Sequence, residues 1–95
     1  MELEIDWSHR EEYIACKHQT TPTIANEALT DPNRVVISPD YASRSGASDR
    51  TIGWSTTAGV VLTVITVEED DGTLFGVNCW KANEKDQRLY REGTE

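Results

Sequence analysis

Hydrophobic and polar positions follow two different periods along the chain, and these periods predict the secondary structure. Alternation of apolar and polar residues is typical of strands, whereas apolar residues spaced three or four apart are typical of helices. The run 60–66 is apolar on both faces, as in a central strand. Strands are expected at 3–5, 34–37, 50–54, 60–66 and 74–79. Helices are expected over about 8–17, 22–29 and 81–92.

Helix starts and turns can also be predicted from single residues. Asp6 or Ser8 can cap the first helix, and Ser8 has Glu11 at the spacing of a capping box. Thr21 can cap the second helix, with Pro22 at its first position. Residues 40–49 have small side chains and one glycine, which predicts an exposed, mobile loop.

The expected order of elements is β-α-α-β-β-β-β-α. Consecutive strands joined by tight turns favour an antiparallel sheet, and apolar helix faces must pack against it. We therefore expect an α+β fold. It would have an antiparallel sheet of about four or five strands, packed by two N-terminal helices and one C-terminal helix. A chain of 95 residues forms one domain, covering residues 1–95.

Charge and cysteine content narrow the function classes. Lys plus Arg number 9 and Asp plus Glu number 17, so the formal net charge is −8. This excess of acidic residues argues against non-specific nucleic-acid binding and suits a basic protein partner.

The acidic start and the lack of a long apolar run predict a cytoplasmic protein with no membrane segment. Cys16 and Cys79 lack metal-type spacing, and we expect reduced thiols, although one disulfide is arithmetically possible.

One arginine and one aspartate are expected on apolar surfaces. Arg50 alternates with Ile52 and Trp54, and we expect Trp54 to belong to the core. Asp86 lies at helical spacing within the apolar stripe of the last helix. Because a buried charge needs a partner, we expect Asp86 and Arg50 to meet between helix and sheet. The pair is either structural or orients Arg50 toward a phosphate.

Several other residues have the chemistry for RNA binding or cleavage. Histidine titrates near neutral pH, so His18, which follows Lys17, is the natural acid or base, or else it caps a helix. Lys81, Lys85 and Arg88 are expected to form a basic strip on the last helix, for RNA phosphates or acidic partner residues, or simply as a solvated face. Trp80, at a strand end, is a candidate for base stacking or partner contact.

The chain resembles the BrnT-type toxins over nearly its whole length. The resemblance rests on an ordered set of short motifs: Asp6-Trp7, Lys17-His18, Ala28, Asp31-Pro32, Arg50-x-Ile-Gly53, Gly59 with 60–66, Ala82 and Tyr90. Asp86 stands where that family usually has Glu, Gln19 replaces a Gly, and Trp80 stands at the position of an Arg.

The resemblance implies a fold similar to RelE-type ribonucleases, a metal-independent endoribonuclease activity without cofactor, and a cognate antitoxin. The implied catalytic residues are Lys17, His18, Arg50, Lys81 and Asp86. The residues expected to bind RNA or partner are Lys85, Arg88, Trp80 and Tyr90. The protein would then form a hetero-oligomer with its antitoxin, or a homo-oligomer. The alternative is a non-catalytic protein-interaction module of the same fold, because Trp80 replaces an arginine.

Overall fold

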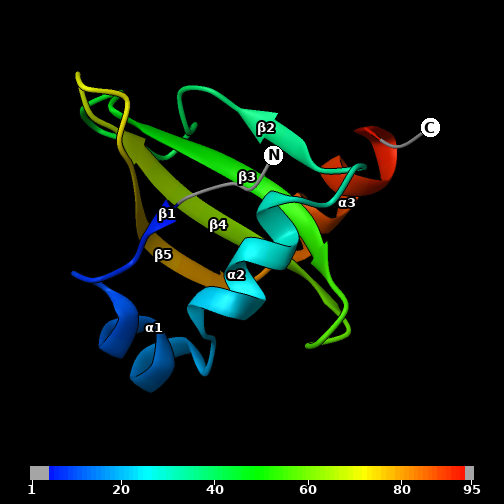
Figure 1. The fold of residues 1–95 in the computed structure, drawn as a ribbon. Coiled ribbons are helices and arrows are strands. Elements are labelled where there is room, and N and C mark those ends of the chain that lie inside the picture. Colours follow the sequence, from blue (N-terminus) through cyan, green and yellow to red (C-terminus); the bar gives the residue numbers. More distant parts are fainter. Residues whose placement is uncertain (1–4, 94–95) are drawn as a thin grey trace.

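The computed structural model describes residues 5–93 and confirms the α+β fold and the predicted order of elements. The elements are β1 (Ile5–Asp6), α1 (Glu11–His18), α2 (Pro22–Leu29), β2 (Val35–Ile37), β3 (Ser48–Ser55), β4 (Val60–Glu68), β5 (Leu74–Lys81) and α3 (Glu84–Gly93). Two helices thus precede the main strands and one follows them (Figure 1).

The five strands form one open sheet in the order β1-β5-β4-β3-β2. Strands β2 to β5 are antiparallel, as expected, and Arg50 of β3 lies opposite Ile65 of β4. The short edge strand β1 runs parallel to β5, with Ile5 opposite Leu74, so the sheet is mixed. The sequence placed this first strand at 3–5, and residues 3 and 4 lie outside the described part of the chain.

The two N-terminal helices begin in different ways. As predicted, α2 has Thr21 at its cap, where the side chain accepts a hydrogen bond from the Ile24 N–H, and Pro22 opens the helix. The predicted cap of α1 is wrong. That helix begins after Arg10, whose side chain makes no capping hydrogen bond, and the Asp6 carboxylate instead accepts hydrogen bonds from Ser8. The Glu11 N–H, which a capping box would direct to Ser8 Oγ, donates to the Trp7 carbonyl instead, and Ser8 Oγ itself donates to Asp6.

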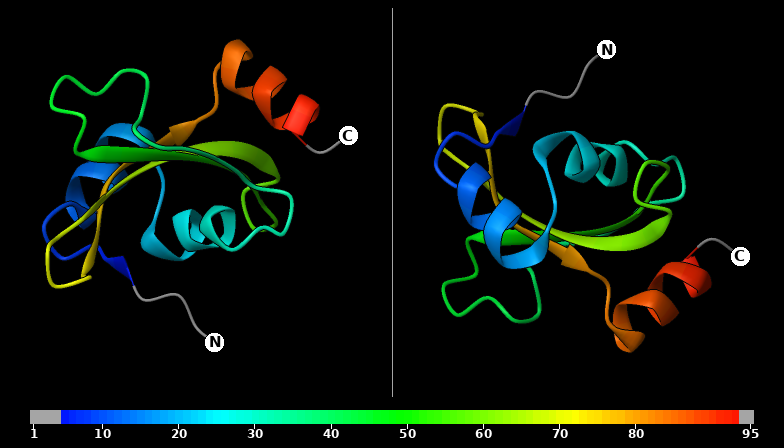
Figure 2. Two further views of the ribbon diagram at one scale, coloured as in Figure 1. Left: turned by 90° about the horizontal axis from the view of Figure 1, so that it is seen from above. Right: turned by 90° about the horizontal axis from the view of Figure 1, so that it is seen from below.

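The apolar core lies between α1, α2 and the sheet (Figure 2). Its buried members are Trp7, Ile14, Ala25, Ala28, Leu29, Leu62, Val64 and Cys79. Gly53 lets α2 approach closely, since a Cβ there would stand 2.1 Å from the carbonyl oxygen of Ala28. Both cysteines are free: Cys16 is exposed, whereas burial raises the pKa of the Cys79 thiol to about 12.

The opposite face of the sheet carries α3 and the loop between β2 and β3 (Figure 2). Three predictions for this face are wrong. The loop prediction 40–49 fails at both ends, because Asp40 is buried and Ser48 and Asp49 already belong to β3. Trp54 is 43% exposed rather than part of the core. Helix α3 begins at Glu84, so Lys81 lies at the end of β5. None of the described helices is long and apolar enough to cross a membrane.

Candidate functional site

A buried ion cluster lies between α3 and the sheet. Arg50 is 4% exposed, and its Nε donates to Asp40 Oδ1 at 2.7 Å. Its Nη1 donates to Asp86 Oδ2 at 2.5 Å, which confirms the predicted meeting of Arg50 and Asp86. A single guanidinium is therefore held between two carboxylates, one from the loop after β2 and one from α3. Its positive charge is compensated inside the protein.

Two hydroxyl groups donate further hydrogen bonds to the carboxylate of Asp86, which is fully buried. Thr63 of β4 donates to Oδ2 at 2.7 Å, and the Tyr41 hydroxyl donates to Oδ1 at 2.8 Å. Burial would raise the pKa of Asp86, but the hydrogen bonds from Thr63 and Tyr41 and the charge of Arg50 outweigh it and lower the pKa. The carboxylate is thus ionised at neutral pH, as an ion pair with Arg50 requires.

Asp40, Tyr41 and Thr63 belong to this cluster although the sequence did not indicate them. The small residues around Asp40 and Tyr41 predicted a mobile loop, whereas the two side chains fasten its first part to Arg50. One signal was available. A buried arginine has five N–H donors to satisfy, so more than one anionic or polar partner should be sought near it.

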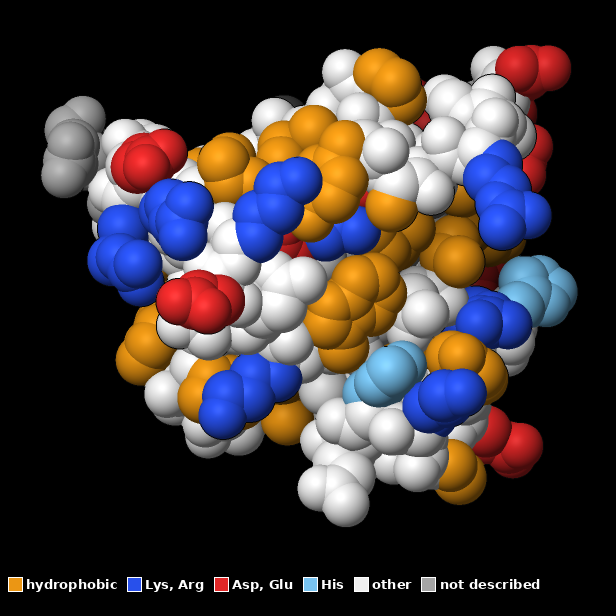
Figure 3. Space-filling view, turned by 180° about the vertical axis from the view of Figure 1, so that it is seen from behind, with side chains coloured by type: hydrophobic (Ala, Val, Ile, Leu, Met, Phe, Trp, Pro, Cys, Tyr) orange, Lys and Arg blue, Asp and Glu red, His pale blue; other side chains and the backbone are white. Residues whose placement is uncertain are grey.

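Aromatic and basic side chains continue from this cluster in a row that passes Trp80 of β5 and ends on α1. The Arg50 guanidinium lies 4.2 Å from the centre of the Tyr41 ring and 5.5 Å from a ring centre of Trp80. Lys85 lies over Tyr41 at 4.0 Å, and His18 lies 6.0 Å from Trp80. The aromatic–basic row, as we call it, consists of Tyr13, His18, Trp80, Arg50, Tyr41 and Lys85. Figure 3 shows blue and orange side chains interspersed over this face.

The predicted site residues therefore divide into two groups. His18, Trp80, Arg50, Asp86 and Lys85 come together in or beside the row. Lys17 is exposed one residue before His18, with its Nζ 5.8 Å from the Tyr13 ring centre.

Lys81, Arg88 and Tyr90 lie outside the row. The predicted strip of Lys81, Lys85 and Arg88 is wrong in its premise, because Lys81 is on β5 and not on the helix. Arg88 is exposed on α3. The Tyr90 hydroxyl donates to Asp31 Oδ2 at 2.6 Å, and burial together with this carboxylate raises the pKa of Tyr90 to about 12. Tyr90 therefore fastens α3 to the segment after α2.

Within residues 5–93, no three His, Cys, Asp or Glu side chains gather in a way that could hold a metal ion. The chain matches no known protein-family model. It also has no significant match among curated proteins.

Proposed function

We propose that the protein is the toxin component of a type II toxin–antitoxin pair, a metal-independent endoribonuclease that acts in the cytoplasm and is inhibited by a partner antitoxin. The observation that carries this proposal is the aromatic–basic row. Single-stranded RNA is bound by aromatic rings that stack on bases and by cations that contact phosphates. The row brings both kinds of side chain together in a chain whose formal net charge is −8.

The row also contains one group suited to proton transfer. His18, beside Trp80, would take the proton from a 2′-hydroxyl, and the 2′-oxygen would attack the adjacent phosphorus. The bond to the 5′-oxygen breaks, and that oxygen receives a proton from an ammonium group such as Lys17. Exposed cations, including Lys85 and Arg88, would hold phosphates along the strand. Arg50 would act as a positioning residue, since its charge is already paired with Asp40 and Asp86.

The test compares the two histidines of the chain. The protein is expressed alone as wild type, as His18→Gln and as His9→Gln, and growth and total-RNA integrity are followed. His9 is exposed and lies outside the row, so its replacement is the matched control. We expect growth arrest and RNA loss with wild type and His9→Gln, and neither with His18→Gln. Arrest with RNA loss in all three would exclude His18 as the acid or base.

A second candidate is a non-catalytic protein-interaction module of the same fold. One observation favours it: Arg50, the arginine expected to act on phosphate, is buried and paired with two carboxylates. In this case the aromatic–basic row would bind acidic side chains of the antitoxin. Normal growth and intact RNA, with folded wild-type protein in the cells, would support this candidate and reject the ribonuclease.

A further inference from the structure

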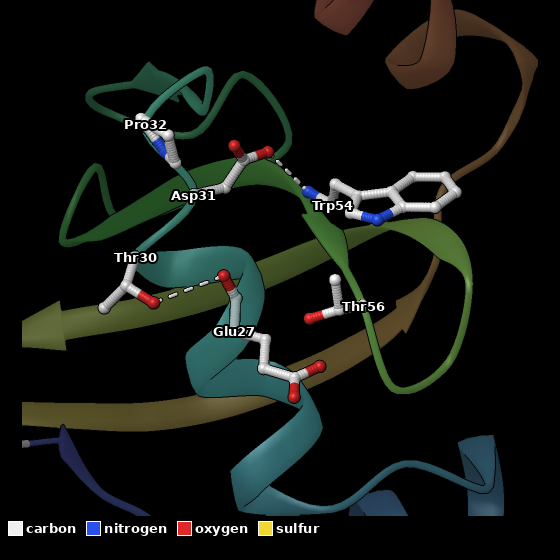
Figure 4. A pocket seen from close by; sticks show the side chains of 6 residues that line it. All are labelled: Glu27, Thr30, Asp31, Pro32, Trp54 and Thr56. Carbon is white, nitrogen blue, oxygen red and sulfur yellow. Dashed lines mark hydrogen bonds between the residues drawn. The ribbon is translucent and has the colours of Figure 1, made fainter.

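The exposed indole of Trp54 stands between two hollows near the turn that joins β3 to β4. The first hollow, of about 230 Å³, is lined by Glu27, Thr30, Asp31, Pro32, Trp54 and Thr56. In Figure 4 the Asp31 carboxylate binds the backbone N–H of Trp54, and the indole extends away from Asp31 and Glu27. The second hollow, of about 220 Å³, is lined by Trp54, Gly59, Val60, Val61, Lys81 and Gln87.

The two hollows differ in charge. Glu27 accepts hydrogen bonds from Ser55 and Thr57, which are neutral donors and lower the pKa of the carboxyl group. Glu27 and Asp31 therefore make the first hollow anionic. The second hollow has Lys81 as its charged residue. Because like charges repel, an anionic ligand that contacts Trp54 is directed to the second hollow.

The second hollow, here called the Trp54 pocket, has fixed walls. Trp54 and Val61 are direct partners on β3 and β4, so their side chains share one face of the sheet. The N–H of Ala82 donates to the Val61 carbonyl at 3.0 Å, which holds the segment that follows Lys81. Gln87 Nε2 donates to the Ala82 carbonyl at 2.9 Å. The pocket thus combines a flat aromatic ring, an apolar floor, a lysine and a fixed amide group.

We propose that the Trp54 pocket binds one nucleotide of single-stranded RNA. The base stacks on the Trp54 indole, its phosphate lies at Lys81, and the Gln87 amide forms a hydrogen bond with the edge of the base. Every base has a flat π-face, so stacking suits any sequence, and the lysine supplies the charge that a phosphate needs. The biological role of the pocket rests on the proposed RNA function, but nucleotide binding itself does not require cleavage.

Nuclear magnetic resonance of the ¹⁵N-labelled protein tests the pocket directly. The chain has three tryptophans, and the Trp54 indole N–H signal is the one lost in Trp54→Phe. We expect adenosine monophosphate and uridine monophosphate to shift this signal. The Trp7 indole is an internal control, because Trp7 is buried and donates to Asn26, so its signal should stay in place. An unchanged Trp54 signal at saturating nucleotide would overturn the proposal.

Binding of a fluorescent 2′-O-methyl oligoribonucleotide measures how much the Trp54 pocket contributes to RNA affinity. Such an RNA lacks the free 2′-hydroxyl and cannot be cleaved by the proposed reaction. Trp54→Ala should weaken binding roughly 5- to 150-fold, the range for one stacked base, and Trp54→Phe should retain most of the affinity. Lys81→Gln should lower the salt dependence by about 0.7 in the slope of log K against log salt. Val36→Ala, at a 55% exposed position on edge strand β2, is the control that should bind as wild type.

Failure of this proposal and failure of the proposed function give different results. RNA cleavage by the wild type, together with unchanged binding by Trp54→Ala, would overturn the Trp54 pocket and leave the ribonuclease in place. A shifted Trp54 signal and weaker binding by Trp54→Ala, without any RNA cleavage, would support the pocket and reject the ribonuclease. Each variant is first checked by thermal unfolding, and Trp54→Ala should melt close to wild type because its side chain is exposed.

Discussion

The two faces of the sheet are made by the same strands, yet they are buried by different chemistry. On the face under α1 and α2, Leu62 and Val64 of β4 pack among other apolar side chains. Thr63, between them, points to the α3 face, where it is equally buried but donates a hydrogen bond to Asp86. One face is held mainly by apolar contacts, whereas the other buries a guanidinium between two carboxylates beside Ile52.

This difference shows that burial imposes unequal demands on sequence. On the apolar face, side chains of the right size are sufficient, and many combinations satisfy that requirement. On the polar face, each buried group needs a particular partner, and every buried side-chain nitrogen and oxygen among residues 5–93 has a hydrogen-bond partner. The polar face should therefore be far more sensitive to the loss of a single group.

The largest expected effect is that of Asp86→Ala. It leaves Arg50 buried with one carboxylate fewer and removes the acceptor of Thr63 and Tyr41. Removing one partner of a buried ion pair costs about 3–5 kcal/mol, and here Arg50 keeps only Asp40 while two hydroxyl groups are left without their acceptor. Urea unfolding followed by circular dichroism measures the loss. A loss below about 1 kcal/mol would show that the ion cluster does not hold α3 on the sheet.

A triple replacement sharpens the same comparison. Arg50→Met combined with Asp86→Leu removes one ion pair and fills its space with apolar side chains, and Asp40→Asn removes the second carboxylate, which would otherwise lose its cation. We expect this protein to be more stable than Asp86→Ala alone, since no charge of the ion cluster is left buried. If the triple variant is the less stable of the two, the ion cluster contributes more to stability than an apolar replacement of the same volume.

The next effect concerns the apolar face, where Gly53→Ala should lower the free energy of unfolding by about 3 kcal/mol. The new Cβ would stand 2.1 Å from the Ala28 carbonyl oxygen, so α2 must move away from the sheet. Gly46→Ala is the control, because its Cβ meets no atom within 4 Å and the positive φ alone costs about 1 kcal/mol. Equal losses in the two variants would mean that the close approach of α2 is not a constraint.

A smaller effect is expected for Tyr90→Phe, which removes the hydrogen bond to Asp31 and about 1 kcal/mol at neutral pH. The pKa of Tyr90 is raised from 10.0 to about 12, by burial and by Asp31. A raised folded-state pKa stabilises the fold below the unfolded value, so this contribution is present up to about pH 10 and lost as pH rises to about 12. Between about pH 10 and 12, the free energy of unfolding should fall less steeply with pH in Tyr90→Phe than in the wild type. Parallel curves for the two proteins would contradict the prediction.

Much of the fold could be predicted from the sequence, because period and propensity determine local structure. The apolar run 60–66 lies within β4, and Thr21-Pro22 opens α2. The meeting of Arg50 and Asp86 also followed from position alone, since both fall on buried faces. The predictions that failed concern features that depend on tertiary contacts. Asp40 and Tyr41 lie in a stretch of small residues, and nothing local indicates that they reach Arg50.

Trp54 was expected in the core because it alternates with Arg50 and Ile52, and alternation does specify its face. Strand β2 pairs with β3 only from Arg50 to Ile52, however, and Trp54, which lies beyond this pairing, is 43% exposed, whereas Trp7 is 4% exposed. The smallest effect is therefore expected for Trp54→Ala, which should cost less than about 1 kcal/mol. Trp7→Ala should cost about 3–5 kcal/mol, as for other buried aromatic side chains. Comparable losses in urea unfolding would mean that Trp54 is covered in solution, which would also close the Trp54 pocket to a nucleotide.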